Sequence, residues 1–297
     1  MSGLAVLLNP RAGSGRAGRV WRHLRSAEPR VQQAQLVESA DPQQAADELA
    51  RAAARGVDRV VVLGGDGSVH LAANVLFRAD LTERVAVGIV PVGTGSDFAK
   101  TLGVPRKSIA ALRRCLEAEP RSIDVLCVET DDGRTERVVN VFSAGISGLV
   151  DEAVHALPRR NALMYLTGAL SAVFRYTPAR CRVLVDGELW HEGEILLVAV
   201  ANATTFGNGM RIAPHARIDD GVADIVLARA VAGWTLPFRL PRLYLGTHLG
   251  LPFIRSGTGR SVRVEPLGSV PAYDVDGEVF EPAPATVTVQ PRALRIL

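Results

Sequence analysis

Residues 60–68, which read VVVLGGDGS, decide the fold of this chain. Four apolar residues predict a buried strand, and the turn Gly64, Gly65, Asp66, Gly67 and Ser68 leads into a helix predicted over 69–78. Glycine permits positive φ and leaves no side chain against a bound phosphate, while the first N–H groups of a helix attract anions. We therefore predict a phosphate-binding turn, with an ordinary strand-to-helix turn as the alternative because Asp-Gly is common in turns.

Strand and helix patterns alternate outward from this turn over the first 123 residues. Strands are predicted at 4–8, 31–37, 60–63 and 85–90, and helices at 16–27, 42–55, 69–78, 96–102 and 107–118. This βαβα order is typical of a parallel sheet with helices on both faces. Ligands bind such sheets at the carboxyl ends of the strands, where the glycine-rich segments of this chain fall.

The pattern changes near residue 123. Short β-prone runs follow at 123–129, 137–142, 180–186, 194–201, 222–228, 260–265 and 285–290, separated by Asp-Gly turns, with helices predicted at 147–157, 161–175 and 235–246. These runs predict a mainly antiparallel second domain, a sandwich or distorted barrel. We expect an α/β domain over 1–123 and a β-rich domain over 124–297, whose C-terminal end is able to pack back on the first domain.

Composition and charge narrow the class of protein. The chain of 297 residues is 47% hydrophobic and 22% charged, and its net charge of +3 suits anionic ligands or an anionic membrane surface. Cys115, Cys127 and Cys181 form no zinc or disulfide pattern, which fits a reducing compartment. The N-terminal apolar run is too short for a signal peptide, and no stretch approaches the ~20 apolar residues of a membrane-spanning helix. We expect a cytoplasmic protein without a nucleic-acid partner.

A second glycine-rich loop, NPRAGSGRAG, occupies residues 9–18 between a predicted strand and a predicted helix. It contains the pattern GxGxxG, and Glu38 follows Gly18 by 20 residues, which is the outline of a dinucleotide-binding fingerprint. However, Asn-Pro-Arg-Ala precedes the first glycine and displaces the expected tight turn. Arg16 is a candidate phosphate contact because it lies in the first turn of the helix.

A third loop, PVGTGSDFAK, occupies residues 91–100 and again joins a predicted strand to a predicted helix. The Thr94 hydroxyl between Gly93 and Gly95 is suited to donate to a phosphate, and Ser96 or Asp97 is expected to cap the helix. Three such loops at consecutive strand ends predict one phosphate cradle along that edge of the sheet.

Taken in order, the three loops resemble the catalytic domain of the diacylglycerol kinase family, which includes sphingosine and ceramide kinases and bacterial lipid kinases. The resemblance continues in FGNGMRIAP at 206–214, DDG at 219–221, GTH at 246–248 and DGE at 276–278, and so covers nearly the whole chain. It implies a first domain like that of NAD kinase and phosphofructokinase, a β-sandwich second domain, and transfer of the γ-phosphate of ATP to a lipid hydroxyl with Mg²⁺.

The resemblance also implies roles for matching residues. With the loops described above, the predicted ATP site comprises Asn9, Pro10, Arg11, Ala12, Gly13, Arg16, Ser39, Gly64, Gly65, Asp66, Gly67, Ser68, Val69, His70, Leu71, Gly93, Thr94 and Gly95. Glu278 matches a general base for the acceptor hydroxyl, and Asp66 is assigned to catalysis because its carboxylate is suited to hold Mg²⁺ through water. Asp220 matches a structural Mg²⁺ ligand, assisted by the backbone carbonyls of Arg217 and Val222.

The match departs from the family pattern mildly at Ser68, where threonine is usual, and more strongly at two other positions. Ser96 stands where asparagine is usual, and Leu71 stands where glutamate is common, which removes a charged contact near the nucleotide. We expect His248 to be structural. Residues 234–254 mix apolar residues with arginines, so they are predicted to line a lipid cleft or touch a membrane, or to form a core helix and loop. The expected partners are a lipid substrate and, transiently, a membrane surface, and a homodimer stays open.

Three other functions remain alternatives at this point. A kinase of a soluble acceptor, related to NAD kinase or phosphofructokinase, shares the Gly-Gly-Asp-Gly loop. A catalytically weak lipid- or nucleotide-binding regulator is suggested by Leu71 and Ser96. An NAD-dependent oxidoreductase would use the GxGxxG pattern and bind NAD in preference to ATP.

Overall fold

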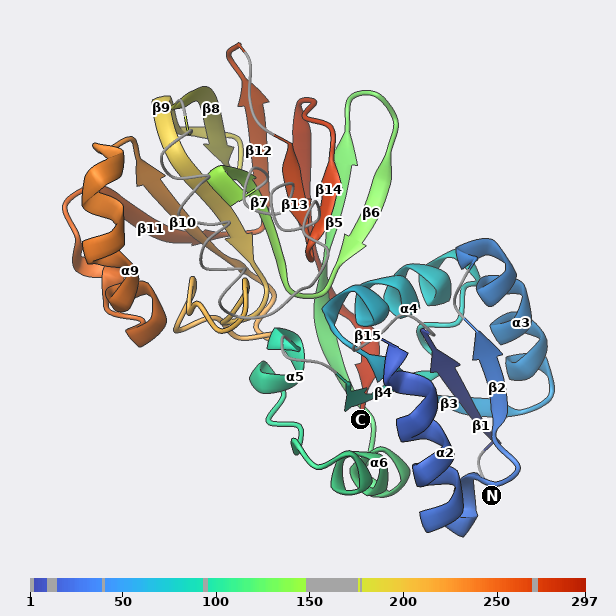
Figure 1. Cartoon of the computed structure of the whole chain (residues 1–297). Helices are drawn as coiled ribbons and strands as arrows, with labels where there is room; N and C mark the ends of the chain where they lie inside the picture. The colour runs from blue at the N-terminus through green and yellow to red at the C-terminus, as the bar shows by residue number, and fades with distance from the viewer. Residues whose placement is uncertain are drawn as a thin grey trace. The chain divides into compact units, whose positions relative to one another are not determined.

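A computed structural model describes residues 3–9, 15–38, 41–92, 96–147, 176, 178–268 and 272–297, except the side chains of Trp234 and Pro237. The chain forms two compact units (Figure 1). Unit 1 comprises residues 1–125 and 292–297, and unit 2 comprises residues 126–291. The chain passes between the units within β5 (Arg121–Thr130) and again within β15 (Ala285–Ile296).

Unit 1 is built on a parallel sheet. Its strands lie in the order β2 (Gln35–Glu38), β1 (Gly3–Leu8), β3 (Val57–Gly64), β4 (Ala86–Pro91) and the last residues of β15. All four pairings are parallel. Because Leu8 pairs with Leu63 and Gly64 pairs with Pro91, the carboxyl ends of β1, β3 and β4 lie side by side. The three glycine-rich loops therefore begin from adjacent strand ends, as expected for a ligand-binding edge.

Helices cover both faces of this sheet. They are α2 (Ala17–Ala27), α3 (Pro42–Ala54), α4 (Asp66–Arg78) and α6 (Ser108–Glu117), and the short α5 (Asp97–Thr101) packs against α4. Helices α2 and α6 pack together on one face, and α3 packs against α4 (Figure 1). The close approach of α6 explains Gly88, where a Cβ would lie 2.6 Å from Sγ of Cys115. Strands buried on both faces explain the continuous apolar runs of β1 and β3.

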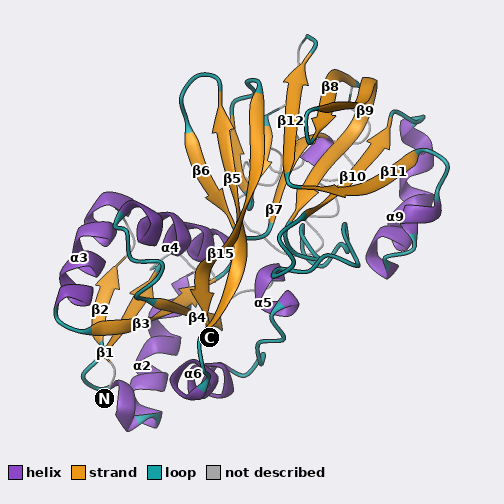
Figure 2. Cartoon of the chain, turned by 180° about the vertical axis from the view of Figure 1, so that it is seen from behind, coloured by secondary structure: helices purple, strands orange, loops and turns teal. Residues whose placement is uncertain are grey.

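Unit 2 is a β-sandwich whose two sheets share one long strand, β9 (Glu188–Ala201) (Figure 2). One sheet has the order β14 (Glu278–Phe280), β13 (Tyr273–Val275), β7 (Val141–Gly145), β9, β10 (Ala223–Arg229) and β11 (Ile254–Gly259), all antiparallel. In the other, β9 is followed by β8 (Ala179–Val185), β12 (Ser261–Pro266), β15, β5 and β6 (Thr135–Val138). Alternate residues of both sheets form a common apolar core, as in sandwiches generally.

A second apolar layer covers the outer face of the sheet that contains β7, β9 and β10. Residues 206–216 contribute Phe206, Ile212 and Ala213 to this layer. Helix α9 (Leu236–Leu245) and the 3₁₀ turn η3 (His248–Gly250) complete it. Because one sheet is apolar on both of its faces, unit 2 has room for an apolar cavity outside its central core.

Most predicted elements are confirmed, and the differences have local causes. The strand expected over 31–37 begins only at Gln35, because Pro29–Val31 forms a 3₁₀ turn. The single run 137–142 is divided between β6 and β7, since residues 139–141 donate their N–H groups to Asp276 instead of continuing one strand. Strands β11, β13 and β14 were not expected. The helix predicted at 161–175, and that at 147–157 beyond its first residue, lie outside the described residues.

Candidate functional site

The start of α4 is tied to the start of α5 by the carboxylate of Asp66. Its two oxygens accept hydrogen bonds from the backbone N–H groups of Asp97 at 2.9 Å and Phe98 at 3.0 Å. Asp66 therefore caps α5 from the first residue of α4, and the expected capping by the side chain of Ser96 or Asp97 is wrong. Ser96 has a left-handed backbone with no side-chain cap, and the Asp97 carboxylate accepts instead from Nζ of Lys100 at 2.7 Å.

Ser96 places a buried hydroxyl beside Gly65. The serine is 7% exposed, and its Oγ has no hydrogen-bond partner among the described residues. It lies 4.0 Å from the point where a Cβ at residue 65 would stand. The carbonyl of Gly64 accepts from the Val92 N–H at 3.0 Å, which holds the two strand ends together. An unpaired hydroxyl over a glycine backbone at a helix N-terminus is suited to a phosphate oxygen.

Helix α4 buries three of its six predicted ligand residues. Ser68, Val69 and His70 are buried in unit 1, while Leu71 is half-buried. His70 lies 3.3 Å from the amide of Asn74 one turn later, and that amide donates to the His70 carbonyl at 3.0 Å. His70 is thus held by its own helix. Its role toward a nucleotide stays a prediction, as do those of Ser68, Val69 and Leu71.

The remaining nucleotide residues are only partly described. Asn9 follows the last residue of β1, and Arg16 is an exposed residue at the start of α2 whose carbonyl accepts from Arg19 and Val20. The other predicted ligands of the first and third loops, with Ser39, lie outside the described residues: Pro10, Arg11, Ala12, Gly13, Ser39, Gly93, Thr94 and Gly95.

In unit 2, Glu278 opens β14 immediately after a two-residue hairpin turn. Asp276 and Gly277 both have positive φ, at 55° and 88°, as the tight turns of β-hairpins require. The Asp276 carboxylate is buried and accepts from the N–H groups of residues 139, 140 and 141 at 2.9 to 3.0 Å. Glu278 itself is exposed and pairs with Val275 across the hairpin. A carboxylate held out on an anchored turn has the rigidity expected of a general base.

Asp220 lies in a turn of unit 2 with a second carboxylate nearby. Its Oδ1 accepts from the Val222 N–H at 3.2 Å, and Arg217 pairs with Asp219 at 3.5 Å. Burial, and then the charge of Asp220, raise the pKa of Asp224 to about 6. Two repelling carboxylates are a setting that a cation relieves, although the described residues contain no group of three His, Cys, Asp or Glu side chains arranged for a metal. Sequence reasoning missed Asp224.

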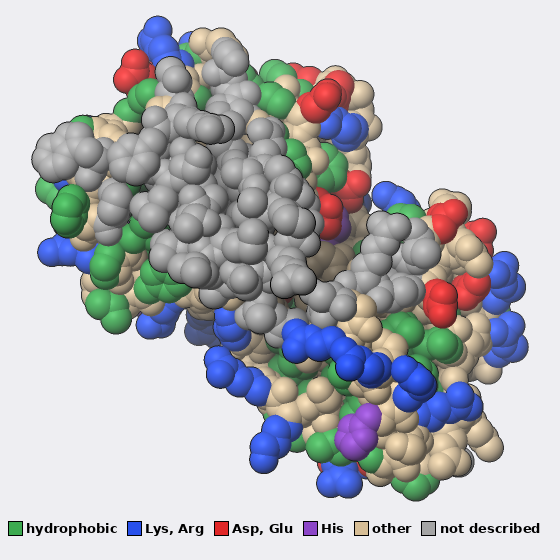
Figure 3. Space-filling view, in the orientation of Figure 1, with side chains coloured by type: hydrophobic (Ala, Val, Ile, Leu, Met, Phe, Trp, Pro, Cys, Tyr) green, Lys and Arg blue, Asp and Glu red, His purple; other side chains and the backbone are tan. Residues whose placement is uncertain are grey.

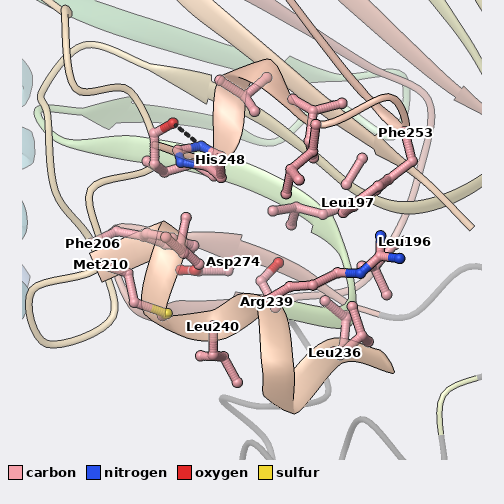
Figure 4. A pocket seen from close by; sticks show the side chains of 18 residues that line it. Leu196, Leu197, Phe206, Met210, Leu236, Arg239, Leu240, His248, Phe253 and Asp274 are labelled. Carbon is pink, nitrogen blue, oxygen red and sulfur yellow. Dashed lines mark hydrogen bonds between the residues drawn. The ribbon is translucent and has the colours of Figure 1, made fainter. Parts of the chain in front are cut away.

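An apolar cavity of about 160 Å³ lies in the second apolar layer of unit 2 (Figure 4). Strands β9 and β10, α9 and the residues after η3 line it, and nearly all of the side chains are apolar. They are Ile146, Ser147, Leu196, Leu197, Phe206, Met210, Ile212, Val226, Ala228, Leu236, Arg239, Leu240, Leu243, His248, Leu251, Phe253, Ile254 and Asp274. Such a lining selects hydrocarbon, and its few polar groups can orient a polar head.

Polar groups gather at one end of this cavity. Figure 4 shows His248 and Asp274 near Phe206 and Met210, whereas the Arg239 guanidinium points the other way and stacks on Phe253 at 4.4 Å. His248 Nε2 lies 3.0 Å from the Ile212 carbonyl, so this nitrogen carries the proton. The buried Nδ1 has no hydrogen-bond partner among the described residues, and burial lowers the pKa of His248. His248 thus offers the cavity an unpaired acceptor.

Asp274 joins the cavity to the hairpin of Glu278. Its Oδ1 accepts from the Gly277 N–H at 2.7 Å, and the Ser143 hydroxyl lies 3.4 Å from its Oδ2. The side chain is 5% exposed and lines the cavity. Sequence reasoning missed Asp274, because an aspartate two residues before a DG turn carries no signal of burial.

Among the described residues, no helix has the length and apolarity needed to cross a membrane.

Two family models match the chain along almost its whole length. The diacylglycerol kinase catalytic domain matches residues 3–128, and the YegS C-terminal NAD kinase beta sandwich-like domain matches residues 140–297. A "Diacylglycerol kinase" of Mycobacterium tuberculosis (strain ATCC 25618 / H37Rv) is 30% identical, with 99% of this chain and 94% of that protein covered. The chain belongs to the diacylglycerol kinase family. This membership makes it a relative of lipid kinases and confirms the resemblance seen in the motifs.

Other members of the family and its structural neighbours agree. A "Probable lipid kinase YegS-like" of Enterobacter sp. (strain 638) is 28% identical over 80% of this family member and 77% of that protein. A diacylglycerol kinase structure from Bacillus anthracis str. Sterne superposes with a TM-score of 0.69, at 20% identity, over 99% and 96% of the two chains. An ATP complex of an NAD kinase from Archaeoglobus fulgidus gives 0.53 at 13% identity over 99% and 92%. These two structures confirm the NAD kinase-like fold class.

Proposed function

We propose that the protein is an ATP-dependent lipid kinase that transfers the γ-phosphate of ATP to the hydroxyl of a lipid such as a diacylglycerol. The observation that carries this proposal is the β13–β14 hairpin, which links an apolar cavity to an exposed carboxylate. Asp274 lines the cavity, and Glu278 pairs across the turn with Val275, the next residue of β13. A hydrocarbon-binding cavity and a positioned base, joined by one hairpin, are what phosphorylation of a lipid alcohol needs.

The nucleotide half of the reaction is assigned to unit 1. The backbone at Gly65, the N-terminus of α4 and the unpaired Ser96 hydroxyl are groups that fit phosphate oxygens. The predicted contacts of the first and third loops extend the same strand-end edge. The name of the Archaeoglobus structural neighbour records an ATP complex, which supports the choice of nucleotide.

The acceptor half is assigned to the cavity of unit 2. Acyl chains would occupy the space among Leu196, Leu240 and Phe253, and the lipid headgroup would face His248 and Asp274. We infer that Glu278 takes the proton from the acceptor hydroxyl as its oxygen bonds to the γ-phosphorus. The bond from that phosphorus to the bridging oxygen breaks, and ADP leaves. Names of the curated relatives support a lipid acceptor.

Mg²⁺ fits the turn at residues 217–224 in its chemistry. Asp220 and the carbonyls of Arg217 and Val222 are hard oxygen ligands, and the negative charge of Asp220 adds to burial in raising the pKa of Asp224. The ion would neutralise this charge and hold the turn. Among the residues described, this turn rather than Asp66 has the more open carboxylates, because both oxygens of Asp66 accept backbone hydrogen bonds.

Asp224→Asn is expected to stabilise the protein in a pH-dependent way. The folded pKa of Asp224, about 6, lies above its ordinary value of 3.8, so the folded state holds the proton more tightly. Stability therefore falls as the pH rises from about 4 to about 6 and stays lower above that range. Since Asp224 is partly exposed, we expect a gain of about 1 kcal/mol at pH ~7.5 and none at pH ~4.

Urea unfolding of both proteins at the two pH values measures this difference. Saturating Mg²⁺ should reduce the difference, because a cation beside Asp220 lowers the pKa of Asp224. An equal effect of the substitution at both pH values would contradict the raised pKa of Asp224. A difference that Mg²⁺ leaves unchanged would contradict the metal site.

Ala228→Phe is expected to weaken phosphorylation of long-chain lipids while nucleotide binding persists. Ala228 lies on β10 with its side chain on the cavity, so a phenyl ring there would occupy space needed by an acyl chain. Turnover of a long-chain lipid should fall at least about tenfold, mostly through a higher KM. Leu197→Met is the matched control, because it changes the shape of the lining while nearly conserving volume. Equal loss in both variants, or full activity of Ala228→Phe, would contradict the role of the cavity.

The proposed function as a whole is tested by incubating the protein with γ-labelled ATP, Mg²⁺ and a total lipid extract, and identifying the labelled product by mass. Parallel reactions contain NAD or a sugar phosphate as soluble acceptors. Labelled lipid supports the proposal, whereas labelled soluble product favours the NAD kinase-like alternative. Saturable binding of ATP or lipid without transfer to any acceptor would favour a regulator.

A further inference from the structure

Helix α9 exposes an unusual amount of apolar surface. Phe238 is 80% exposed, Leu245 68% and Tyr244 41%, and these are three of the seven exposed large hydrophobic side chains among the described residues. Phe238 and Leu245 are seven residues apart, so they lie on the same side of the helix. Leu236, Leu240 and Leu243 point the other way and line the cavity. The helix is therefore apolar on both sides, and only one side is used by the fold.

The segment around α9 carries positive charge only. Residues 225–264 contain six arginines and no aspartate or glutamate: Arg229, Arg239, Arg242, Arg255, Arg260 and Arg263. Among the ion pairs of the described residues, only Arg263 takes part, with Asp131 and Glu265. Arg242 is exposed one turn after Phe238. Figure 3 shows green and blue side chains, and no red ones, along the left edge where Figure 1 places α9.

We propose that α9 docks the protein on an anionic lipid bilayer. Phe238 and Leu245 enter the boundary between headgroups and acyl chains, and Arg242 lies among the anionic headgroups. This inference deepens the proposed function, on which it rests for the identity of the substrate. The docking surface adjoins the cavity, because the side of α9 opposite Phe238 forms part of the cavity lining. A lipid leaving the bilayer at α9 would pass from one apolar surface to the next.

Charge argues for a bilayer rather than for a second copy of the chain. In a symmetric dimer through α9, the same surface would face itself, so arginines without acidic partners would be brought together. The headgroups of an anionic membrane supply negative charge to each of these arginines. Each arginine near such a surface contributes about fivefold to the binding constant, and the contribution falls with salt.

The test is co-sedimentation of the full chain, without ATP, with vesicles of phosphatidylcholine alone or with phosphatidylglycerol added. We expect the wild type to bind the mixed vesicles, with weaker binding in high salt. The double variant Phe238→Ser, Leu245→Ser should lose at least about tenfold in binding, and Arg242→Gln about fivefold. Leu189→Ser is the control, because Leu189 is 61% exposed on β9 and lies outside the basic segment.

Wild-type binding by the double variant, or an equal loss in the Leu189 variant, would overturn the proposal. The proposal would also be overturned if light scattering showed that the wild type is a dimer and the double variant a monomer. Helix α9 would then be an interface between copies of the chain. Turnover of a short-chain lipid in detergent micelles separates docking from catalysis. The double variant should retain it, and an unchanged melting temperature shows that it folds. If α9-dependent vesicle binding occurs but no lipid is phosphorylated, docking stands and the proposed function fails.

Discussion

Glu278→Gln is expected to lower kcat for lipid phosphorylation by about 10²- to 10⁴-fold, the usual contribution of a general base. Glutamine has nearly the same shape but cannot take the proton of the acceptor hydroxyl. Glu278 is exposed on the hairpin, while Asp276 provides the three buried hydrogen bonds that anchor the turn. The substitution should therefore leave the melting temperature and ATP affinity unchanged, as measured by calorimetry.

Glu281→Gln is the matched control for this experiment. Glu281 is an exposed glutamate three residues further along the chain, just after β14. Its loss of charge should change kcat by less than about twofold, because the residue has no assigned role in proton transfer. If both variants were equally active, Glu278 would not be the base. Equal loss in both would point to a general effect of negative charge at this end of the hairpin.

Local signals in the sequence were sufficient for the parallel sheet of unit 1. The run before Gly64 is apolar on both faces, so it predicts a buried strand, and the strand observed is Val57–Gly64. The same reasoning failed at Val31, where the β-branched side chain suggested a strand but Pro29 starts a 3₁₀ turn. Short strands such as β13 and β14 have too few residues for periodicity to show, and tertiary pairing decides them.

Candidate site residues divide in the same way. The glycine-rich loops and the DGE hairpin are recognisable because each depends on neighbours in the sequence. The roles of Asp274, Asp224 and the cavity lining depend on contacts between residues far apart in the chain. No spacing in the sequence therefore predicts them. Ser96 illustrates the difference: its position in the third loop is visible in the sequence, but its unpaired hydroxyl beside Gly65 follows only from the approach of two strand ends.

Asp66→Ala is expected to destabilise the protein by about 1–2 kcal/mol and to lower kcat/KM by at least about 100-fold. Both oxygens of Asp66 accept backbone N–H groups at the start of α5, and the alanine side chain accepts none. The N-terminal end of α5 would then move away from α4, and Ser96 would move with it. Because Ser96 lies at the proposed phosphate-binding edge, its displacement is expected to lower ATP affinity as well as turnover. Urea unfolding and ATP calorimetry measure the two effects.

Asp41→Ala separates the two effects, since Asp41 caps α3 with similar hydrogen bonds. Its Oδ1 accepts from the N–H groups of Gln43 at 2.8 Å and Gln44 at 3.2 Å. Losing this cap should cost about 1 kcal/mol, close to the loss at Asp66, and leave ATP binding unchanged. If Asp66→Ala lost no more activity than Asp41→Ala, Asp66 would be only a helix cap. If Asp66→Ala lost more activity than Asp41→Ala at equal stability, Asp66 would be assigned to the nucleotide site. Its hydrogen bonds would then matter because they position the start of α5.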